Sequence, residues 1–176
     1  KLYKEELPGI ALALDEGLAS TDSVFSVFYG ERLPWWIDVT AHGNVGHGSR
    51  FIDETAVEQL VELANKALAF REGQRAALHD NPQHENCAHA VAAKKTLGDV
   101  TTLNITTLQA GVQVGNTYAY NCVPPVATCS LDIRISPHVP PKDISDMLDQ
   151  WCHECSRSEQ HKVTWKYIDG QNGGSG

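Results

Sequence analysis

The spacing of hydrophobic residues changes repeatedly along residues 35–168, and the order of these changes is the strongest constraint on the fold. A period of two indicates a half-buried strand, whereas apolar residues every three or four positions indicate an amphipathic helix. Strand patterns cover residues 35–42, 100–108, 127–135 and 161–168, and helical patterns begin at Asp53 and Pro140. This order predicts an α+β fold, a ferredoxin-like βαββαβ sandwich in which two helices cover one face of a four-stranded antiparallel sheet.

The two helical patterns differ in their start signals. The first predicts about six turns, with Ser49 or Asp53 as the N-cap. Its periodic apolar positions are Val57, Leu60, Val61, Ala64, Leu68 and Ala69. The second begins at a pair of prolines and carries its apolar residues on one face, at Ile144, Leu148, Trp151 and Cys155. The polar stretch 73–99 predicts a loop or a frayed helix end, and residues 111–125 supply turn residues between two strands.

The two ends of the chain do not fit this unit. Residues 10–14 (IALAL) form a continuous apolar run, which is typical of a strand buried on both faces in an α/β sheet. We therefore predict three parts: a segment of a separate α/β domain at 1–34, the α+β unit at 35–169, and a flexible tail or linker at 170–176.

Charge and cysteine content limit the partners and the compartment. The formal net charge of −8 and the pI near 5.4 exclude a basic nucleic-acid footprint. The apolar run at 10–14 is far shorter than the roughly 20 residues that span a bilayer, and acidic residues occupy the place of a signal peptide's basic region. Because of the acidic charge and the short apolar run, we expect neither nucleic acid nor membrane as a partner. The five cysteines have no framework spacing, so we expect reduced thiols and a cytoplasmic location.

His47 is the sharpest local feature, because Gly46 and Gly48 flank it. Glycines permit unusual backbone angles and leave an imidazole unobstructed, and such a histidine can donate to a developing oxyanion. A surface histidine without a role is the alternative. Arg134 has the same parity as Asp132 in a strand pattern, so it either forms a weak surface pair or presents a guanidinium fork to a carboxylate. Asn121 lies in the preceding turn.

Two clusters carry metal-ligand residue types but lack half of a four-ligand zinc set. The first comprises His84, Cys87 and His89, and a thiol-based or metal-binding regulator is the function that it would support. In the second, Cys152 and Cys155 lie one turn apart on an apolar helix face, where buried thiols behave as small hydrophobic groups.

Six motifs taken together resemble the aminoacylases of the di-zinc metallopeptidase superfamily, which also contains carboxypeptidase G and peptidase T. The resemblance covers roughly residues 7–168. The motifs are ALDEG at 13–17, VFSVFYGERLPWW at 24–36, GHGSRF at 46–51, LAFR at 68–71, YNCVP at 120–124 and DIRI at 132–135.

The resemblance implies that residues 35–169 are the lid, or dimerisation domain, and that 1–34 is the tail end of the first catalytic segment. By resemblance, Glu16 matches a carboxylate zinc ligand of the complete enzyme. His47 matches a lid histidine that reaches across the dimer and steadies the oxyanion. Asn121 and Arg134 match residues that hold the free carboxylate of the substrate.

The implied activity is zinc-dependent hydrolysis of N-acyl-L-amino acids to a carboxylate and a free L-amino acid, by a homodimer with two zinc ions per complete subunit. Most of the family's metal ligands have no counterpart in these residues, so we expect this chain alone to be inactive and to bind no zinc. Residues 111–120 are longer than the family's short turn, a departure that threatens the position of Asn121. A non-catalytic homodimerising module is the alternative function.

Overall fold

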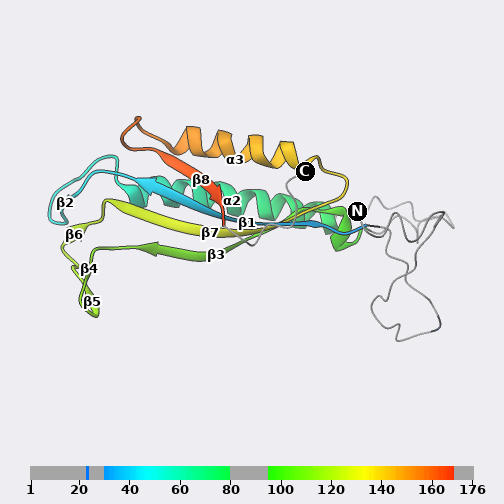
Figure 1. Ribbon diagram of the computed structural model, residues 1–176, viewed down its shortest axis with the longest axis horizontal. Helices are drawn as coiled ribbons and strands as arrows, with labels where there is room; N and C mark the ends of the chain where they lie inside the picture. The colour runs from blue at the N-terminus through cyan, green and yellow to red at the C-terminus, as the bar shows by residue number, and fades with distance from the viewer. Residues whose placement is uncertain (1–22, 24–29, 80–94, 169–176) are drawn as a thin grey trace, which may run out of the picture. The chain divides into compact units, whose positions relative to one another are not determined.

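The computed structural model describes residue 23 and residues 30–79 and 95–168. The predicted apolar strand at 10–14 therefore lies outside the described residues. The compact unit begins at Glu31. Its elements (Figure 1) are β1 (Leu33–His42), β2 (Gly46–His47), α2 (Ala56–His79), the 3₁₀ turn η2 (Leu97–Asp99), β3 (Thr102–Ala110), β4 (Gln113–Val114), β5 (Thr117–Tyr118), β6 (Cys122–Val123), β7 (Val126–Ile135), α3 (Pro141–Cys155) and β8 (Val163–Tyr167).

The main sheet has the strand order β3-β7-β1-β8, and every neighbouring pair is antiparallel. α2 and α3 run along one face of this sheet (Figure 1). The long strands and the two helices alternate in the chain as β1-α2-β3-β7-α3-β8. The prediction of a ferredoxin-like α+β sandwich is therefore confirmed.

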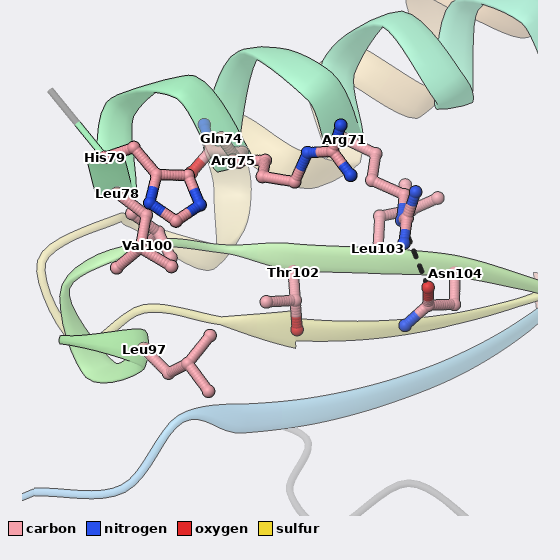
Figure 2. Close-up of a pocket in the computed structure, with 10 residues that line it drawn as sticks. All are labelled: Arg71, Gln74, Arg75, Leu78, His79, Leu97, Val100, Thr102, Leu103 and Asn104. Atoms are coloured by element: carbon pink, nitrogen blue, oxygen red, sulfur yellow. Dashed lines mark hydrogen bonds between the residues drawn. The ribbon is translucent and has the colours of Figure 1, made fainter.

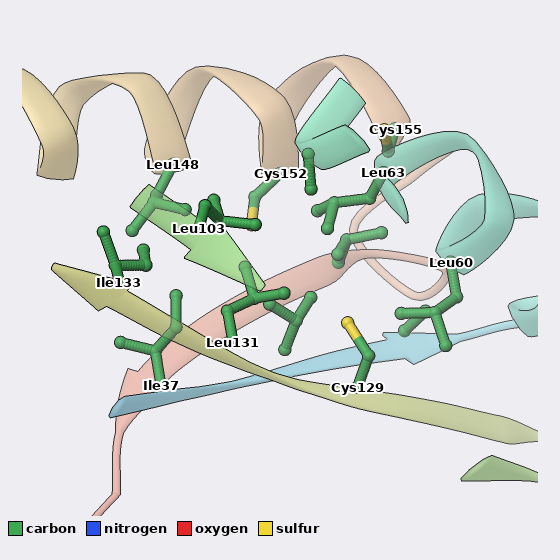
Figure 3. Packing of buried hydrophobic residues seen from close by; sticks show 14 of the residues in the cluster. Ile37, Leu60, Leu63, Leu103, Cys129, Leu131, Ile133, Leu148, Cys152 and Cys155 are labelled. Carbon is green, nitrogen blue, oxygen red and sulfur yellow. The ribbon is translucent and has the colours of Figure 1, made fainter. Parts of the chain in front are cut away.

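The core lies between this sheet face and the two helices (Figure 3). Alternate residues of β7 point into it, and Cys129, Leu131 and Ile133 are fully buried. Cys152 and Cys155 close the core from α3, in agreement with the prediction of buried thiols. Burial raises the pKa of the Cys152 thiol to about 12 and that of Cys155 to about 11, since a low-dielectric interior disfavours the thiolate.

The start of α2 differs from the prediction. Thr55, rather than Ser49 or Asp53, caps the helix through a reciprocal box with Glu58. The Thr55 hydroxyl accepts the Glu58 N–H at 3.2 Å, and the Glu58 carboxylate accepts the Thr55 N–H at 3.0 Å. The Thr55 hydroxyl also donates to the Glu58 carboxylate at 2.8 Å, and this hydrogen bond together with the one from the Thr55 N–H lowers the pKa of Glu58.

The buried face of α2 is also rotated from the predicted one. Val61 and Leu68 are about half exposed, whereas Gln59, Leu63 and Ala67 are buried. The helix continues to His79, so residues 73–79, which begin the stretch predicted as a loop or a frayed helix end, are helical. No helix in the described ranges is both long and apolar enough to cross a membrane.

Candidate functional site

The loop that carries His47 is held firmly where β1 ends. Gly43 lies so close to the start of α2 that a Cβ at this position would be 2.1 Å from the Ala56 nitrogen. The Gln59 side chain donates to the His42 carbonyl at 2.7 Å, and the Asn44 side chain donates to the Asp53 carbonyl at 3.0 Å. The sheet and the helix therefore fix both ends of the loop.

His47 itself lies in β2, whose only partner among the described strands is β6. Its ring is exposed. Gly46 and Gly48 are not among the described glycines with positive φ, so the expected unusual backbone angles are absent at these two positions. Gly46 and His47 instead pair with Val123 and Cys122 in the short β2–β6 ladder.

Ser49 selects the tautomer of His47. Its backbone N–H donates to Nδ1 at 3.2 Å, and its hydroxyl lies 2.8 Å from the same atom. Because Nδ1 accepts a backbone hydrogen bond, the proton of the neutral ring is on Nε2. The outward nitrogen of His47 is thus a donor, as a contact to an oxyanion requires.

Asn121 lies directly beside this donor. Its backbone carbonyl accepts the Gly48 N–H at 2.8 Å, and its side-chain Nδ2 lies 3.3 Å from His47 Nε2. With the proton on Nε2 both groups are donors, so they do not hydrogen-bond to each other and are able to donate to one bound acceptor. The extra residues before it fold into the small β4–β5 hairpin, which the Ala119 N–H closes onto the Val112 carbonyl at 2.9 Å. The longer segment therefore does not separate Asn121 from His47.

Arg134 lies on the sheet face opposite the helices, in a network with two other side chains. Its Nε and Nη2 donate to the two Asp132 carboxylate oxygens at 2.7 and 3.0 Å. Trp36 donates to the same carboxylate at 3.1 Å, and its ring lies 5.1 Å from the guanidinium carbon. Partial burial opposes ionisation of Asp132, but the hydrogen bonds from Arg134 and Trp36 prevail and lower its pKa.

Both interpretations of Arg134 survive in this arrangement. The pair with Asp132 exists, and it holds the guanidinium by one edge. Nη1 makes no hydrogen bond to any residue of the described ranges, so its N–H groups remain available to a carboxylate.

One copy of the chain does not bring Arg134 to His47. The β2–β6 ladder adjoins the β7 end at Val126, because His42 pairs with Val126, whereas Arg134 lies eight residues further along β7. At about 3.3 Å per residue this separation is about 26 Å. His47 and Asn121 are therefore together, and Arg134 is at the opposite end of the sheet.

The described residues do not fit a metal ion. Among them, no group of three or more histidine, cysteine or acidic side chains could hold one. Glu16 and the cluster His84, Cys87 and His89 lie outside the described residues. In the second predicted cluster, Glu154 is paired with Lys66 at 2.7 Å.

Two contributors to the site were not expected from the sequence. Ser49 orients His47, and its position two residues later is a local signal that could have been used. Trp36 supports Asp132 from a different strand, and only the pairing register of β1 with β7 places the two opposite each other.

The family model described as the peptidase dimerisation domain, of the M20 group, matches residues 29–158. The chain belongs to this M20 dimerisation-domain family. The M20 match confirms the resemblance inferred from the motifs, and the boundaries predicted at 34 and 169 stay predictions.

Curated relatives carry the same aminoacylase name. Aminoacylase-1 of Dictyostelium discoideum is 50% identical over 147 residues, which cover 82% of this chain and 34% of that protein. Human aminoacylase-1 is 37% identical over 159 residues, which cover 90% of this chain and 35% of that protein. The M20 domain chain thus spans about a third of the length of these relatives.

A solved structure shares the fold at low identity. A protein from methicillin-resistant Staphylococcus aureus, described as an aminohydrolase, superposes with a TM-score of 0.52 at 12% identity. The match covers 80% of this chain and 30% of that one. At this identity the similarity concerns the fold alone.

Proposed function

We propose that this chain is the lid and dimerisation part of a zinc-dependent aminoacylase, which hydrolyses N-acyl-L-amino acids to a carboxylate and a free L-amino acid. The observation that carries the proposal is the His47–Asn121 pair, in which the Nε2–H of His47 and the Nδ2 group of Asn121 are neighbouring donors, on a domain 50% identical to an aminoacylase-1. The metal ligands of such an enzyme, Glu16 among them, belong to residues beyond the described ranges.

The homodimer is proposed to form along β3. This strand is at the edge of the main sheet, and its second half is exposed, including Leu108. Leu68 lies one turn before Arg71, whose Nε donates to Asn104 on β3, so the exposed Leu68 side chain lies on the flank of α2 nearest this edge. An exposed edge strand with apolar side chains beside it favours pairing with a second copy.

Such pairing would supply a site that one copy lacks. Two β3 strands related by a two-fold axis run antiparallel, so Arg134 of one copy comes to the same end of the joined sheet as His47 and Asn121 of the partner subunit. The two β7 strands are then three strand spacings apart, about 14 Å, against about 26 Å along β7 within one copy. This supports a role for His47 across the dimer.

Each residue then has a role suited to its chemistry. The His47 Nε2–H stabilises the oxyanion that develops at the amide carbon. The free Nη1 edge of the Arg134 guanidinium and the Asn121 amide hold the substrate carboxylate, for which a planar fork is selective. Asp132 and Trp36 position the guanidinium and do not contact the substrate.

A chimera tests this proposal. Residues 31–168 replace the matching segment of Dictyostelium discoideum aminoacylase-1, and hydrolysis of N-acetyl-L-methionine is measured. His47→Ala should lower kcat roughly 100-fold to 1,000-fold, as removal of an oxyanion donor does. Arg134→Lys should mainly raise KM. His153→Ala removes an exposed histidine of α3 and should change neither parameter.

A folded, dimeric chimera whose kcat is indifferent to His47→Ala would contradict the assigned role and favour a non-catalytic dimerising module. The 176-residue chain alone, supplied with zinc, should show no hydrolysis above a chelator-treated control. Hydrolysis that chelator and His47→Ala both abolish would mean that these residues contain a working metal site, against the proposal.

We also propose a cytoplasmic location. The described cysteines, Cys122, Cys129, Cys152 and Cys155, are all free thiols, and buried thiols without partners are typical of a reducing compartment.

A further inference from the structure

The β4–β5 hairpin is a preorganised arm with no charged residue in 111–120. Gly115 has a φ of 58° at the first central turn position, where a type II′ turn needs a positive value. Gly111 has a φ of 118°, and a Cβ on it would lie 2.8 Å from the Tyr118 ring. Val114 and Tyr118 are nonetheless half exposed, at 57% and 51%. The arm is thus ordered by its own contacts but leaves apolar surface uncovered.

A pocket with apolar residues in its lining lies beside the opposite end of β3, between that strand and the last turns of α2 (Figure 2). Its volume is about 240 Å³. Leu78, Leu97 and Val100 supply apolar lining, and Leu97 is 55% exposed.

The basic residues of this pocket are already engaged. Arg71 donates to Asn104 at 3.2 Å, and both Arg71 and Arg75 are paired with Glu72, at 3.3 and 2.8 Å. Two arginines and one carboxylate keep a net charge of +1, so the pocket disfavours a cationic occupant. Leu78, Leu97 and Val100 favour apolar contact, and the β4–β5 arm, which carries no charged residue, meets both conditions.

The arm cannot reach the pocket of its own copy. β3 has nine residues between them, which corresponds to about 30 Å. In an antiparallel β3–β3 dimer, however, the chain that continues past Ala110 runs over the start of the other copy's β3 strand. The pocket lies at that start, since Val100 and Thr102 line it.

We propose that each β4–β5 arm docks into the α2–β3 pocket of the other copy, with Val114 and the methyl group of Thr117, which share one face of the hairpin, covering Leu78 and Leu97. The inference rests on the proposed function, because it takes β3 as the dimer interface, and it adds an exchanged contact on each side of the two-fold axis. The arm would then act as a dimer clasp built from the residues that lengthen the turn before Asn121.

Cross-linking tests this clasp directly. Val114→Cys and Leu97→Cys are introduced together in the 176-residue chain, with Cys87 and the exposed Cys122 replaced by serine, and the protein is treated with a short bismaleimide. The intramolecular distance is too long for the reagent, so only contact between copies yields a product. The double variant should give covalent dimers in clear excess over each single variant.

Introducing a pair of opposite charges gives an independent readout. Val114→Asp and Leu97→Arg should each weaken the dimer roughly tenfold to a hundredfold in light scattering, and the two together should restore most of the affinity. Val45→Asp, at a residue of similar exposure in another loop, is the matched control and should leave the dimer unchanged.

The outcomes separate the two claims. If the wild type is dimeric but the double-cysteine variant gives no cross-link, the clasp is overturned while the proposed β3 dimer stands. The same holds if Val114→Asp leaves the dimer intact. A monomeric wild-type chain with an intact fold would overturn the proposed homodimer and the clasp with it.

Discussion

The two faces of β7 differ in burial and in chemistry. On the helix side, Leu131 and Ile133 are fully buried in a dry apolar core. On the other side, Asp132 and Arg134 remain partly exposed and belong to a hydrogen-bonded network with Trp36. Because side chains alternate along a strand, adjacent residues can serve stability and recognition independently.

The largest expected effect is on the buried face. Leu131→Ala should lower the free energy of unfolding by about 2–5 kcal/mol, since it leaves a cavity in a closed core. Urea unfolding followed by circular dichroism measures this loss. Thr128→Ala, on the opposite face of the same strand, should cost less than about 1 kcal/mol. Equal losses in the two variants would break the distinction between the faces.

The buried thiols of the core make the stability of the helix-side face depend on pH. Burial raises the pKa of Cys152 from 9.0 to about 12, so the folded state keeps a proton that the unfolded state releases. Their contribution to stability is therefore complete below pH 9 and is lost as pH rises from 9 towards 12. Between pH 8 and pH 10, Cys152→Val should lose about 1 kcal/mol less stability than the wild type. Urea unfolding under reducing conditions measures both proteins. Equal losses of unfolding free energy in wild type and Cys152→Val over this pH range would contradict a buried, protonated thiol.

The helix cap next to the core is expected to have a smaller effect. Thr55→Ala should cost about 1 kcal/mol, because it removes the hydroxyl that accepts the Glu58 N–H. Hydrogen bonds from Thr55 lower the pKa of Glu58, so this stabilisation is present above the ordinary value of 4.5 and fades as pH falls. Unfolding at pH 7 and pH 3 should show a smaller difference between Thr55→Ala and wild type at the lower pH.

Periodicity was sufficient for the architecture and insufficient for the details. The alternation at 127–135 correctly predicts β7, because one buried face imposes a period of two. The face of α2 was predicted only in part: Leu60 and Ala64 are buried, but Val61 and Leu68 are about half exposed and Gln59 is buried. A glutamine that satisfies a strand-end carbonyl is a tertiary feature, which no helical pattern contains.

For the candidate site too, the sequence identifies residues but not how far apart they lie. The flanking glycines drew attention to His47, and parity correctly placed Arg134 with Asp132. Their separation depends on how β1, β2 and β6 meet at one end of the sheet, which follows from register and not from residue type. The resemblance named residues for one site, and a single copy distributes them between two ends.

The polar face of β7 should contribute least to stability. Arg134→Lys should lower the free energy of unfolding by less than about 1 kcal/mol, because its partner is a partly exposed carboxylate and the ammonium can still pair with it. The lysine cannot form the two parallel hydrogen bonds, so Asp132 is left less firmly held and the guanidinium fork proposed to bind the substrate carboxylate is lost. Unfolding in urea beside Leu131→Ala measures the contrast between neighbours three positions apart. A loss as large as that of Leu131→Ala would assign the Arg134 network to structural support, whereas a small loss leaves substrate binding as the reason for a guanidinium at this position.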